Sequence, residues 1–106
     1  MDNKKEALAR ALGDIFLLAD RQTVSNLRGE ALQLRRREFQ LLSFLANNSP
    51  TVINRYAMLD LIWDYESFAG SNTLEVHLCS LRRKLKQLTR RVYIETIRGV
   101  GYRLVS

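Results

Sequence analysis

Five leucines at helical spacing constrain the fold of this chain more than any other feature of its sequence. On a helical wheel of 100° per residue they fall within about 40° of one another. They are Leu74, Leu78, Leu81, Leu85 and Leu88. Residues 73–88 are therefore predicted to form a helix whose apolar face packs on a core. Asn72 and Glu75 stand at the spacing of a capping box and predict where this helix begins.

The segment that follows this helix predicts a β-hairpin. Residues 92–97 and 102–105 have the composition of two strands. They are joined by Arg98-Gly99-Val100-Gly101, whose glycines permit a tight turn. The last third of the chain is thus expected to be a helix followed directly by a hairpin with an arginine at its tip.

Short strands are predicted in the N-terminal part of the chain. Apolar segments at residues 15–19, 23–24 and 31–34 are separated by polar turn residues, which indicates a small antiparallel meander. Residues 1–12 are polar and rich in alanine, and we expect them to be a linker or tail. One domain would then span residues 13–106.

Two further helices are predicted between the meander and the leucine-rich helix. From Arg36 the apolar residues recur at helical spacing, and this helix must end before Pro50. Asn54 can cap a second helix that runs to about Trp63. Strands and helices in this order predict an α+β domain.

The net charge of +6 lies in one segment of the chain. Basic and acidic side chains cancel in residues 1–34 and again in residues 35–70, whereas residues 71–106 carry eight basic and two acidic side chains. Such a field attracts polyanions, of which nucleic acid and anionic membranes are the usual ones. The alternative is an ordinary solvated charged face.

Composition excludes several classes of protein. One cysteine and one histidine exclude an internal disulfide and a multi-cysteine zinc site, so we expect no metal centre. No apolar run approaches the roughly 20 residues that span a membrane. No catalytic constellation is visible, so we expect no enzyme activity and no cofactor. These features fit a protein of the reducing cytoplasm.

The predicted helix could read duplex DNA with the face opposite its leucines. Val76 suits a thymine methyl group, and the small Cys79 and Ser80 would let the helix approach the bases closely. Arg83 and Lys84 lie further along, where phosphates would run. A helix fits the major groove and an arginine-bearing tip fits the minor groove, which agrees with the predicted hairpin.

Several motifs in this order resemble the winged-helix effector domain of the OmpR/PhoB response regulators, a family of bacterial transcription factors. The resemblance covers roughly residues 14–105. The motifs are Glu38-Phe39-x-Leu41-Leu42, Leu59-x-x-x-Trp63, Leu74-Glu75-Val76-His77-Leu78-x-x-Leu81-Arg82-Arg83-Lys84-Leu85 and Thr96-Ile97-Arg98-Gly99-Val100-Gly101-Tyr102-Arg103-Leu104. The resemblance implies a winged helix-turn-helix with an N-terminal antiparallel sheet of four strands, three helices and a C-terminal β-hairpin wing. The fourth strand would lie within residues 7–12.

The resemblance also implies sequence-specific binding of double-stranded DNA, with a role for each matching position. Residues 73–88 would be the recognition helix in the major groove, and Arg98 on the wing would enter the minor groove. The DNA-binding set would be Trp63, Asn72, Thr73, Val76, His77, Cys79, Ser80, Arg82, Arg83, Lys84, Thr96, Arg98 and Tyr102. The loop after the second helix corresponds to a segment thought to meet RNA polymerase in some members; its residues here are Asp64, Tyr65, Glu66, Ser67 and Phe68.

Family members commonly carry a receiver domain and bind direct repeats as head-to-tail dimers. If the present chain is a fragment, its full-length protein is expected to be a two-component response regulator with a receiver domain. The domain alone would then be a monomer that pairs on DNA.

Two departures from the family pattern leave alternatives open. Many members have a long polar residue where Cys79 and Ser80 stand, so the chain could instead be a protein-interaction module with weakened base readout. The first helix usually begins with Thr-Pro, but Arg35-Arg36 stand there. Either this helix end is weak, because a cap is lost and positive charge opposes the helix dipole, or residues 35–37 bind a partner such as phosphate.

Several single residues also allow a plainer interpretation. His77 fits a phosphate contact or packing better than catalysis. Cys79 could be a redox switch but is more often just a small residue facing a groove. Trp63 could be a core anchor, a DNA contact or both. RNA binding is a weaker hypothesis, because the chain offers no evident aromatic platform for single strands.

Overall fold

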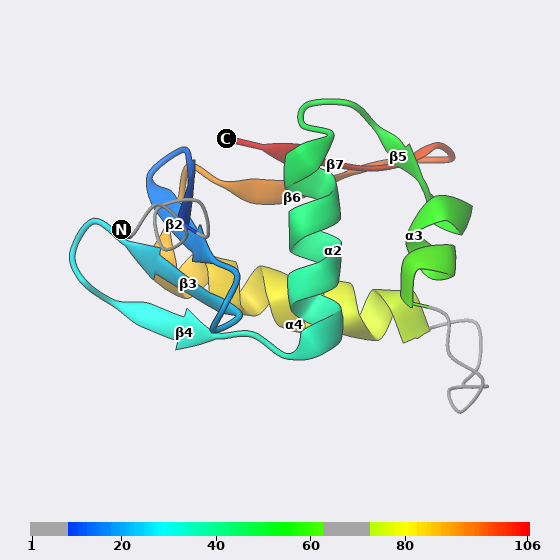
Figure 1. Ribbon diagram of the computed structural model, residues 1–106. Coiled ribbons are helices and arrows are strands. Elements are labelled where there is room, and N and C mark those ends of the chain that lie inside the picture. Colours follow the sequence, from blue (N-terminus) through cyan, green and yellow to red (C-terminus); the bar gives the residue numbers. More distant parts are fainter. Residues whose placement is uncertain (1–8, 63–72) are drawn as a thin grey trace.

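Three helices and two small antiparallel sheets make up the described part of the computed structural model, residues 9–62 and 73–106 (Figure 1). The helices are α2 (Arg36–Asn47), α3 (Arg55–Ile62) and α4 (Thr73–Leu88). The α4 bounds confirm the helix that the leucine spacing predicts. The Oδ1 atom of Asn54 accepts a hydrogen bond of 2.9 Å from the N–H of Ala57, which confirms the predicted cap of α3.

The N-terminal sheet has four strands in the order β1-β2-β3-β4, each antiparallel to its neighbour. They are β1 (Ala9–Leu12), β2 (Ile15–Leu18), β3 (Thr23–Asn26) and β4 (Ala31–Gln33). Strand β1 lies in the segment that we assigned to a linker, and it is the fourth strand that the family resemblance implies. Pairing of β1 with β2 therefore extends the sheet to before the predicted boundary at residue 13.

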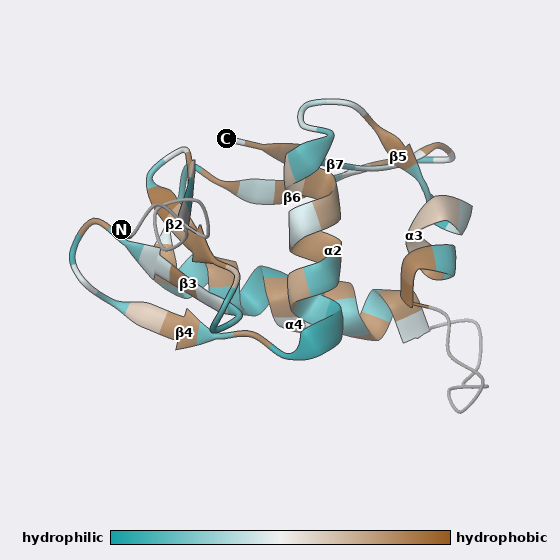
Figure 2. Cartoon of the chain, in the orientation of Figure 1, coloured by the Kyte–Doolittle hydropathy of each residue, from teal (hydrophilic) through white to brown (hydrophobic). Residues whose placement is uncertain are grey.

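The core forms where the leucine face of α4 meets α2 and the sheets. All five leucines of the predicted stripe are buried, with exposed fractions of 3% or less. Leu41, Leu42 and Leu45 of α2 are fully buried in the same cluster. Figure 2 shows α4 alternating between hydrophobic and hydrophilic residues along its length, as a helix with one buried face must. The opposite face of α4 is left for solvent or a ligand.

The C-terminal hairpin, called the wing below, consists of β6 (Tyr93–Ile97) and β7 (Gly101–Val105). A two-residue strand, β5 (Ile53–Asn54), adds to β7 and gives the order β5-β7-β6. The wing follows α4 in the chain. Through its pairing with β5 it is also connected to the start of α3.

Gly101 is required for this junction. A Cβ atom on Gly101 would lie 2.0 Å from the carbonyl oxygen of Ile53, closer than any real contact. We predicted Gly101 for its freedom in a turn, but its φ is not among the positive ones, whereas Gly99 has φ +77°. Gly99 therefore makes the turn, and Gly101 allows β5 to approach the wing.

Candidate nucleic-acid interface

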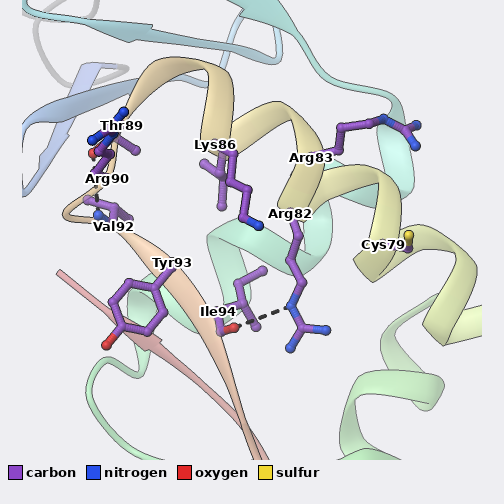
Figure 3. Close-up of a pocket in the computed structure, with 10 residues that line it drawn as sticks. Cys79, Arg82, Arg83, Lys86, Thr89, Arg90, Val92, Tyr93 and Ile94 are labelled. Atoms are coloured by element: carbon purple, nitrogen blue, oxygen red, sulfur yellow. Dashed lines mark hydrogen bonds between the residues drawn. The ribbon is translucent and has the colours of Figure 1, made fainter.

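The exposed face of α4 carries short apolar or sulfur-bearing side chains followed by cations. Val76 is 58% exposed, and Cys79, Arg83 and Lys86 are also exposed. In Figure 3, Arg83 points away from the wing strand, whereas Arg82 reaches toward it. We call this the outward face of α4. It presents the short side chains of Val76 and Cys79 and then the positive charge of Arg83, as the sequence predicts for these three residues.

On one side of this face, α4 is fastened to α2 through a buried carboxylate. Glu38 is only 1% exposed, and its Oε1 atom accepts a hydrogen bond of 2.7 Å from Nζ of Lys84. Its other oxygen accepts a short hydrogen bond from the hydroxyl of Ser80. The Oε1 atom also accepts a hydrogen bond of 2.8 Å from the N–H of Arg35, the residue before α2. One carboxylate therefore caps α2 and holds the middle of α4.

This carboxylate is ionised at neutral pH. Burial by itself would raise the pKa of Glu38, but hydrogen bonds from Lys84, Ser80 and the Arg35 N–H, together with the charge of Lys84, outweigh it. The result is a pKa below the ordinary value of 4.5. Glu38 and Lys84 thus form an ion pair whose charges cancel.

The same contacts change the geometry that we predicted for two residues of the DNA-binding set. The Ser80 hydroxyl and the Lys84 ammonium both point to α2, where Glu38 engages them. Neither group lies with Val76 and Cys79 on the outward face. The sequence reasoning missed Glu38, although a signal was present: Glu38 shares a helical face with the buried Leu41, Leu42 and Leu45.

On the other side of the outward face, α4 is fastened to the wing. Nε of Arg82 donates to the carbonyl oxygen of Ile94 at 3.3 Å, and another nitrogen of its guanidinium donates to Oγ1 of Thr96 at 2.6 Å. The guanidinium carbon lies 6.0 Å from the centre of the Tyr102 ring. Three predicted site residues therefore meet, and Tyr102, which is 8% exposed, supports Arg82 from inside the core.

A basic groove runs between α4 and β6 (Figure 3). Its lining includes the exposed Cys79 and Tyr93. Four cations line it as well: Arg82, Arg83, Lys86 and Arg90. Lys86 and Arg90 are not in the predicted DNA-binding set, although their charge was counted in the basic segment.

The tip of the wing presents Arg98 to solvent. Arg98 is exposed, and the N–H of Val100 donates to the carbonyl of Ile97 at 2.9 Å to close the turn. A smaller groove separates this tip from the start of α3, and it is lined by Tyr56, Val100 and their neighbours. Tyr56 is 77% exposed there and was not predicted as a site residue.

Glu75 makes a contact with α3; its predicted role as a helix cap involves Asn72, which lies outside the described residues. Nε of Arg55 lies 3.0 Å from Oε2 of Glu75, and this hydrogen bond is the main reason that the pKa of Glu75 lies below its ordinary value. The ion pair ties the first turn of α4 to α3. Thr73 and His77 are half-buried on the same half of α4.

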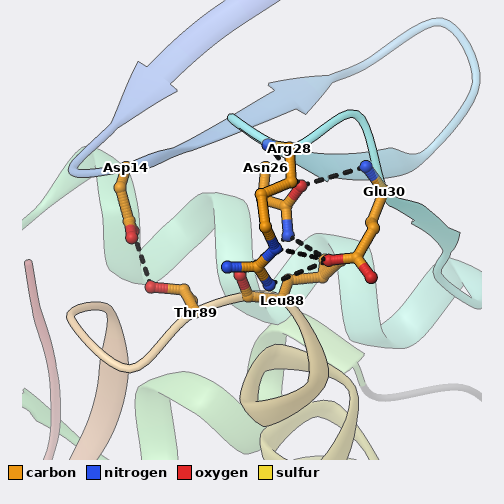
Figure 4. Close-up of polar contacts among 6 residues, drawn as sticks. All are labelled: Asp14, Asn26, Arg28, Glu30, Leu88 and Thr89. Atoms are coloured by element: carbon orange, nitrogen blue, oxygen red, sulfur yellow. Dashed lines mark hydrogen bonds and ion pairs between the residues drawn. The ribbon is translucent and has the colours of Figure 1, made fainter.

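The C-terminal end of α4 is anchored to the N-terminal sheet (Figure 4). Nδ2 of the buried Asn26 donates to the carbonyl oxygen of Leu88 at 3.0 Å and to Glu30 at 2.8 Å. The hydroxyl of Thr89 donates to Oδ1 of Asp14 at 2.6 Å. The outward face of α4 is therefore held from α2, from the wing and from the sheet.

Some predicted residues lie outside the described part of the chain. These are Trp63, Asn72 and the predicted polymerase-contact residues Asp64, Tyr65, Glu66, Ser67 and Phe68. Within residues 9–62 and 73–106, histidine, cysteine and acidic side chains form no cluster of three or more that could hold a metal ion. The helices of the same residues are too short or too polar to cross a membrane.

Comparison with known proteins identifies the family. Residues 29–104 match the family model described as "Transcriptional regulatory protein, C terminal". The chain is 45% identical over 76 residues to the transcriptional regulatory protein VxrB of Vibrio cholerae, and the match covers 72% of this chain and 29% of VxrB. It is 33% identical to the alkaline phosphatase synthesis transcriptional regulatory protein PhoP of Bacillus subtilis, over 88% of this chain and 39% of PhoP. The chain thus spans about a third of the length of these curated relatives.

A solved structure agrees with this match. The DNA-binding domain of the response regulator AdeR, solved in complex with an intercistronic region, superposes with a TM-score of 0.75 at 26% identity; the match covers 92% of this chain and 99% of that one. The chain therefore belongs to the family of C-terminal domains of transcriptional regulatory proteins, the winged-helix DNA-binding domains of OmpR/PhoB-type response regulators, which are not enzymes.

Proposed function

We propose that this chain binds duplex DNA with sequence specificity in order to regulate transcription in a bacterium. Helix α4 enters the major groove with its outward face, and Arg98 at the tip of the wing enters the minor groove. The observation that carries this proposal is the exposure of Val76, Cys79 and Arg83 between two fastened flanks of α4.

The two flanks explain how such a helix could read bases. Readout needs side chains held within a fraction of an ångström, because hydrogen bonds and methyl contacts to base edges are short-ranged. Glu38 fixes one flank of α4, and the contact of Arg82 with Ile94 and Thr96 fixes the other. Val76 would then meet a thymine methyl, and Arg83 a guanine edge or a phosphate.

The groove between α4 and β6 suits the DNA backbone. When a helix occupies the major groove and an adjacent hairpin reaches the minor groove, the phosphodiester strand between them passes over the space that separates helix and hairpin. Arg82, Lys86 and Arg90 line that space here. Lys86 and Arg90 thereby join the predicted DNA-binding set as phosphate contacts.

Further partners follow from the family. We propose a receiver domain in the full-length protein, pairing of two copies head to tail on a direct repeat, and contact of residues 64–68 with RNA polymerase. The receiver domain is supported by the comparison with VxrB and PhoP, because the match covers only 29% of VxrB and 39% of PhoP.

A protein-interaction role with weakened base readout remains the second candidate, and one observation favours it. The Ser80 hydroxyl and the Lys84 ammonium are engaged by Glu38, which leaves few polar groups on the outward face to discriminate bases.

Selection of bound sequences from a random duplex pool, at two salt concentrations, separates the candidates. Enrichment of a motif, with affinity that falls steeply as salt rises, supports sequence-specific DNA binding. Binding without a motif would favour non-specific contact with the backbone. Absence of binding even at low salt would exclude DNA and leave the protein-interaction role.

A further inference from the structure

Two exposed arginines precede and begin α2, beside the outward face of α4. We propose that Arg35 and Arg36 bind phosphates of the DNA strand that borders α4 on its α2 side. This proposal rests on the proposed function, and it assigns a second backbone-binding patch on the flank opposite the wing.

The position of the patch follows from shared hydrogen bonds. The Oε1 atom of Glu38 accepts hydrogen bonds both from the N–H of Arg35 and from Nζ of Lys84. This shared acceptor places the backbone of Arg35 close to the middle of α4. The other oxygen of Glu38 accepts from Ser80, one turn earlier on α4. Figure 1 shows the same arrangement, with the N-terminal end of α2 lying against α4.

Arg35 and Arg36 differ from several other cations of the domain in having no carboxylate partner among the described residues. Lys84 is neutralised by Glu38, and Arg28, Arg55 and Arg103 are paired with carboxylates elsewhere. The side chains of Arg35 and Arg36 are exposed and make no ion pair with any residue in the ranges 9–62 and 73–106. Their charge on the α2 side of α4 is therefore available to a ligand.

Folding gives no reason for these two arginines. The side chain of Arg35 makes no capping hydrogen bond, although it occupies the position where serine, threonine or aspartate would cap the helix. Positive charge in the first turn opposes the helix dipole. The backbone of Arg35 is held by Glu38, and no hydrogen bond or ion pair among the described residues requires an arginine side chain at either position.

The dimensions of DNA agree with a patch on this side. The major groove is about 12 Å wide, and an α-helix with its side chains is about 10–12 Å across, so a helix in the groove has one phosphodiester strand along each flank. The wing and the groove between α4 and β6 serve one strand. Arg35 and Arg36 are placed to serve the other.

The test is the salt dependence of DNA binding by the variant Arg35→Gln/Arg36→Gln, measured on a duplex selected with the unaltered chain. The plot of log K against log salt has a negative slope, and removing one protein–phosphate contact on B-DNA reduces the steepness of this slope by about 0.9. We expect a slope less steep by about 0.9 to 1.8, the same preferred sequence, and a thermal midpoint equal to or above that of the unaltered chain. The variant Arg35→Lys/Arg36→Lys keeps the charge and should restore most of the slope.

Arg10→Gln is the matched control. Arg10 is exposed, and its guanidinium lies at the opposite end of α2, where it donates to the side chain of Asn47 and, at 3.0 Å, to the carbonyl of Ala46. Its removal should leave the slope unchanged. If the double glutamine variant keeps the slope of the unaltered chain, the patch is refuted while DNA binding stands. If the unaltered chain does not bind DNA at low salt, the proposed function and the patch both fall.

Discussion

Arg83 and Lys84 are adjacent in sequence and both basic, but they face different surroundings because an α-helix turns 100° per residue. Arg83 is exposed on the outward face of α4, whereas Lys84 is half-buried against Glu38. Charge at a residue therefore contributes to DNA binding only when no neighbouring carboxylate cancels it. Substitutions at Arg83 and Lys84 can therefore distinguish a contribution to DNA binding from a contribution to stability.

We expect Arg83→Ala to weaken DNA binding and Lys84→Ala to lower the stability of the domain. Arg83→Ala should make the negative slope of log K against log salt less steep by about 0.9 and change the free energy of unfolding by less than about 0.5 kcal/mol. Lys84→Ala leaves Glu38 buried without its charged partner and should destabilise the domain by about 1–3 kcal/mol. Filter binding and urea unfolding measure the two effects, and a large loss of stability in Arg83→Ala would contradict its assignment to the outward face.

Glu38 also predicts how stability depends on pH. Its pKa in the folded state is below the ordinary value of 4.5, so the folded state favours the ionised carboxylate. This contribution is fully present above about pH 5 and is lost as the pH falls through the lowered pKa. In Glu38→Gln the contribution is absent at every pH.

The difference in unfolding free energy between the unaltered chain and Glu38→Gln should therefore shrink from about pH 6 to about pH 3. Urea unfolding at a series of pH values measures it. Asp60→Asn serves as a control, because Asp60 is an exposed carboxylate on α3, where solvent and salt screen its interactions. A difference for Glu38→Gln that does not vary with pH would mean that Glu38 is not ionised in the folded domain.

The side-chain contacts between α4 and α2 were the least predictable part of the site. The outward face of α4 follows from periodicity, and Val76, Cys79 and Arg83 lie where the wheel puts them. The partners of Ser80 and Lys84 depend on how α2 crosses α4, and no local pattern specifies a crossing. Glu38 was nevertheless visible as a charge on an apolar face, which predicts a buried ion pair somewhere in the fold.

Among the elements, long periodic ones were predicted well and short ones less so. Helix α4 has the bounds that its leucines indicate, because five apolar residues on one face outweigh any local ambiguity. Strand β1 was placed in a linker because the sequence Ala9-Arg10-Ala11-Leu12 has weak strand propensity, and it becomes a strand by pairing with β2. Strand β5 exists only through its pairing with β7.

The β5–β7 junction makes a prediction at the level of the element. In Gly101→Ala the new methyl group would lie against the backbone of Ile53 and Asn54, which cannot move aside as a side chain could. We expect a loss of about 1–3 kcal/mol or more in the free energy of unfolding, measured by chemical denaturation. Gly99→Asn is the control, since Gly99 has open space around it and asparagine tolerates a positive φ. Equal stability of Gly101→Ala and the unaltered chain would show that β5 does not pair with β7 as described.

At the scale of the whole molecule, charge counted along the sequence differs from charge arranged in space. Sequence counting puts the entire excess in residues 71–106, because the four basic and four acidic side chains of residues 35–70 cancel. In the fold, Glu38 of that middle segment neutralises Lys84 of the last one, while Arg35 and Arg36 come to lie beside α4 without an acidic partner among the described residues. The positive surface is therefore wider than the basic segment, and it borders α4 on both flanks.

The wing tip is the far end of this surface, and its arginine should act differently from the cations along α4. Arg98 lies on a turn that needs only Gly99 for its shape, so Arg98→Ala should leave the thermal midpoint within about 2 °C of the unaltered chain. A narrow minor groove in A·T-rich DNA attracts an inserted arginine through its negative potential. Arg98→Ala should therefore weaken binding most for duplexes whose wing-side flank is A·T-rich and least for those whose flank is G·C-rich.

Titration of paired duplexes that differ only in this flank measures the effect. Arg28→Gln is the comparison, because Arg28 is exposed in the turn between β3 and β4 and is already paired with Glu30. We expect it to change neither affinity nor flank preference. An equal loss of affinity for both flanks in Arg98→Ala would place Arg98 on a phosphate instead of in the minor groove, and no loss would remove the wing tip from the interface. Either result would leave the recognition of bases to α4 alone, where Val76, Cys79 and Arg83 would have to supply all of it.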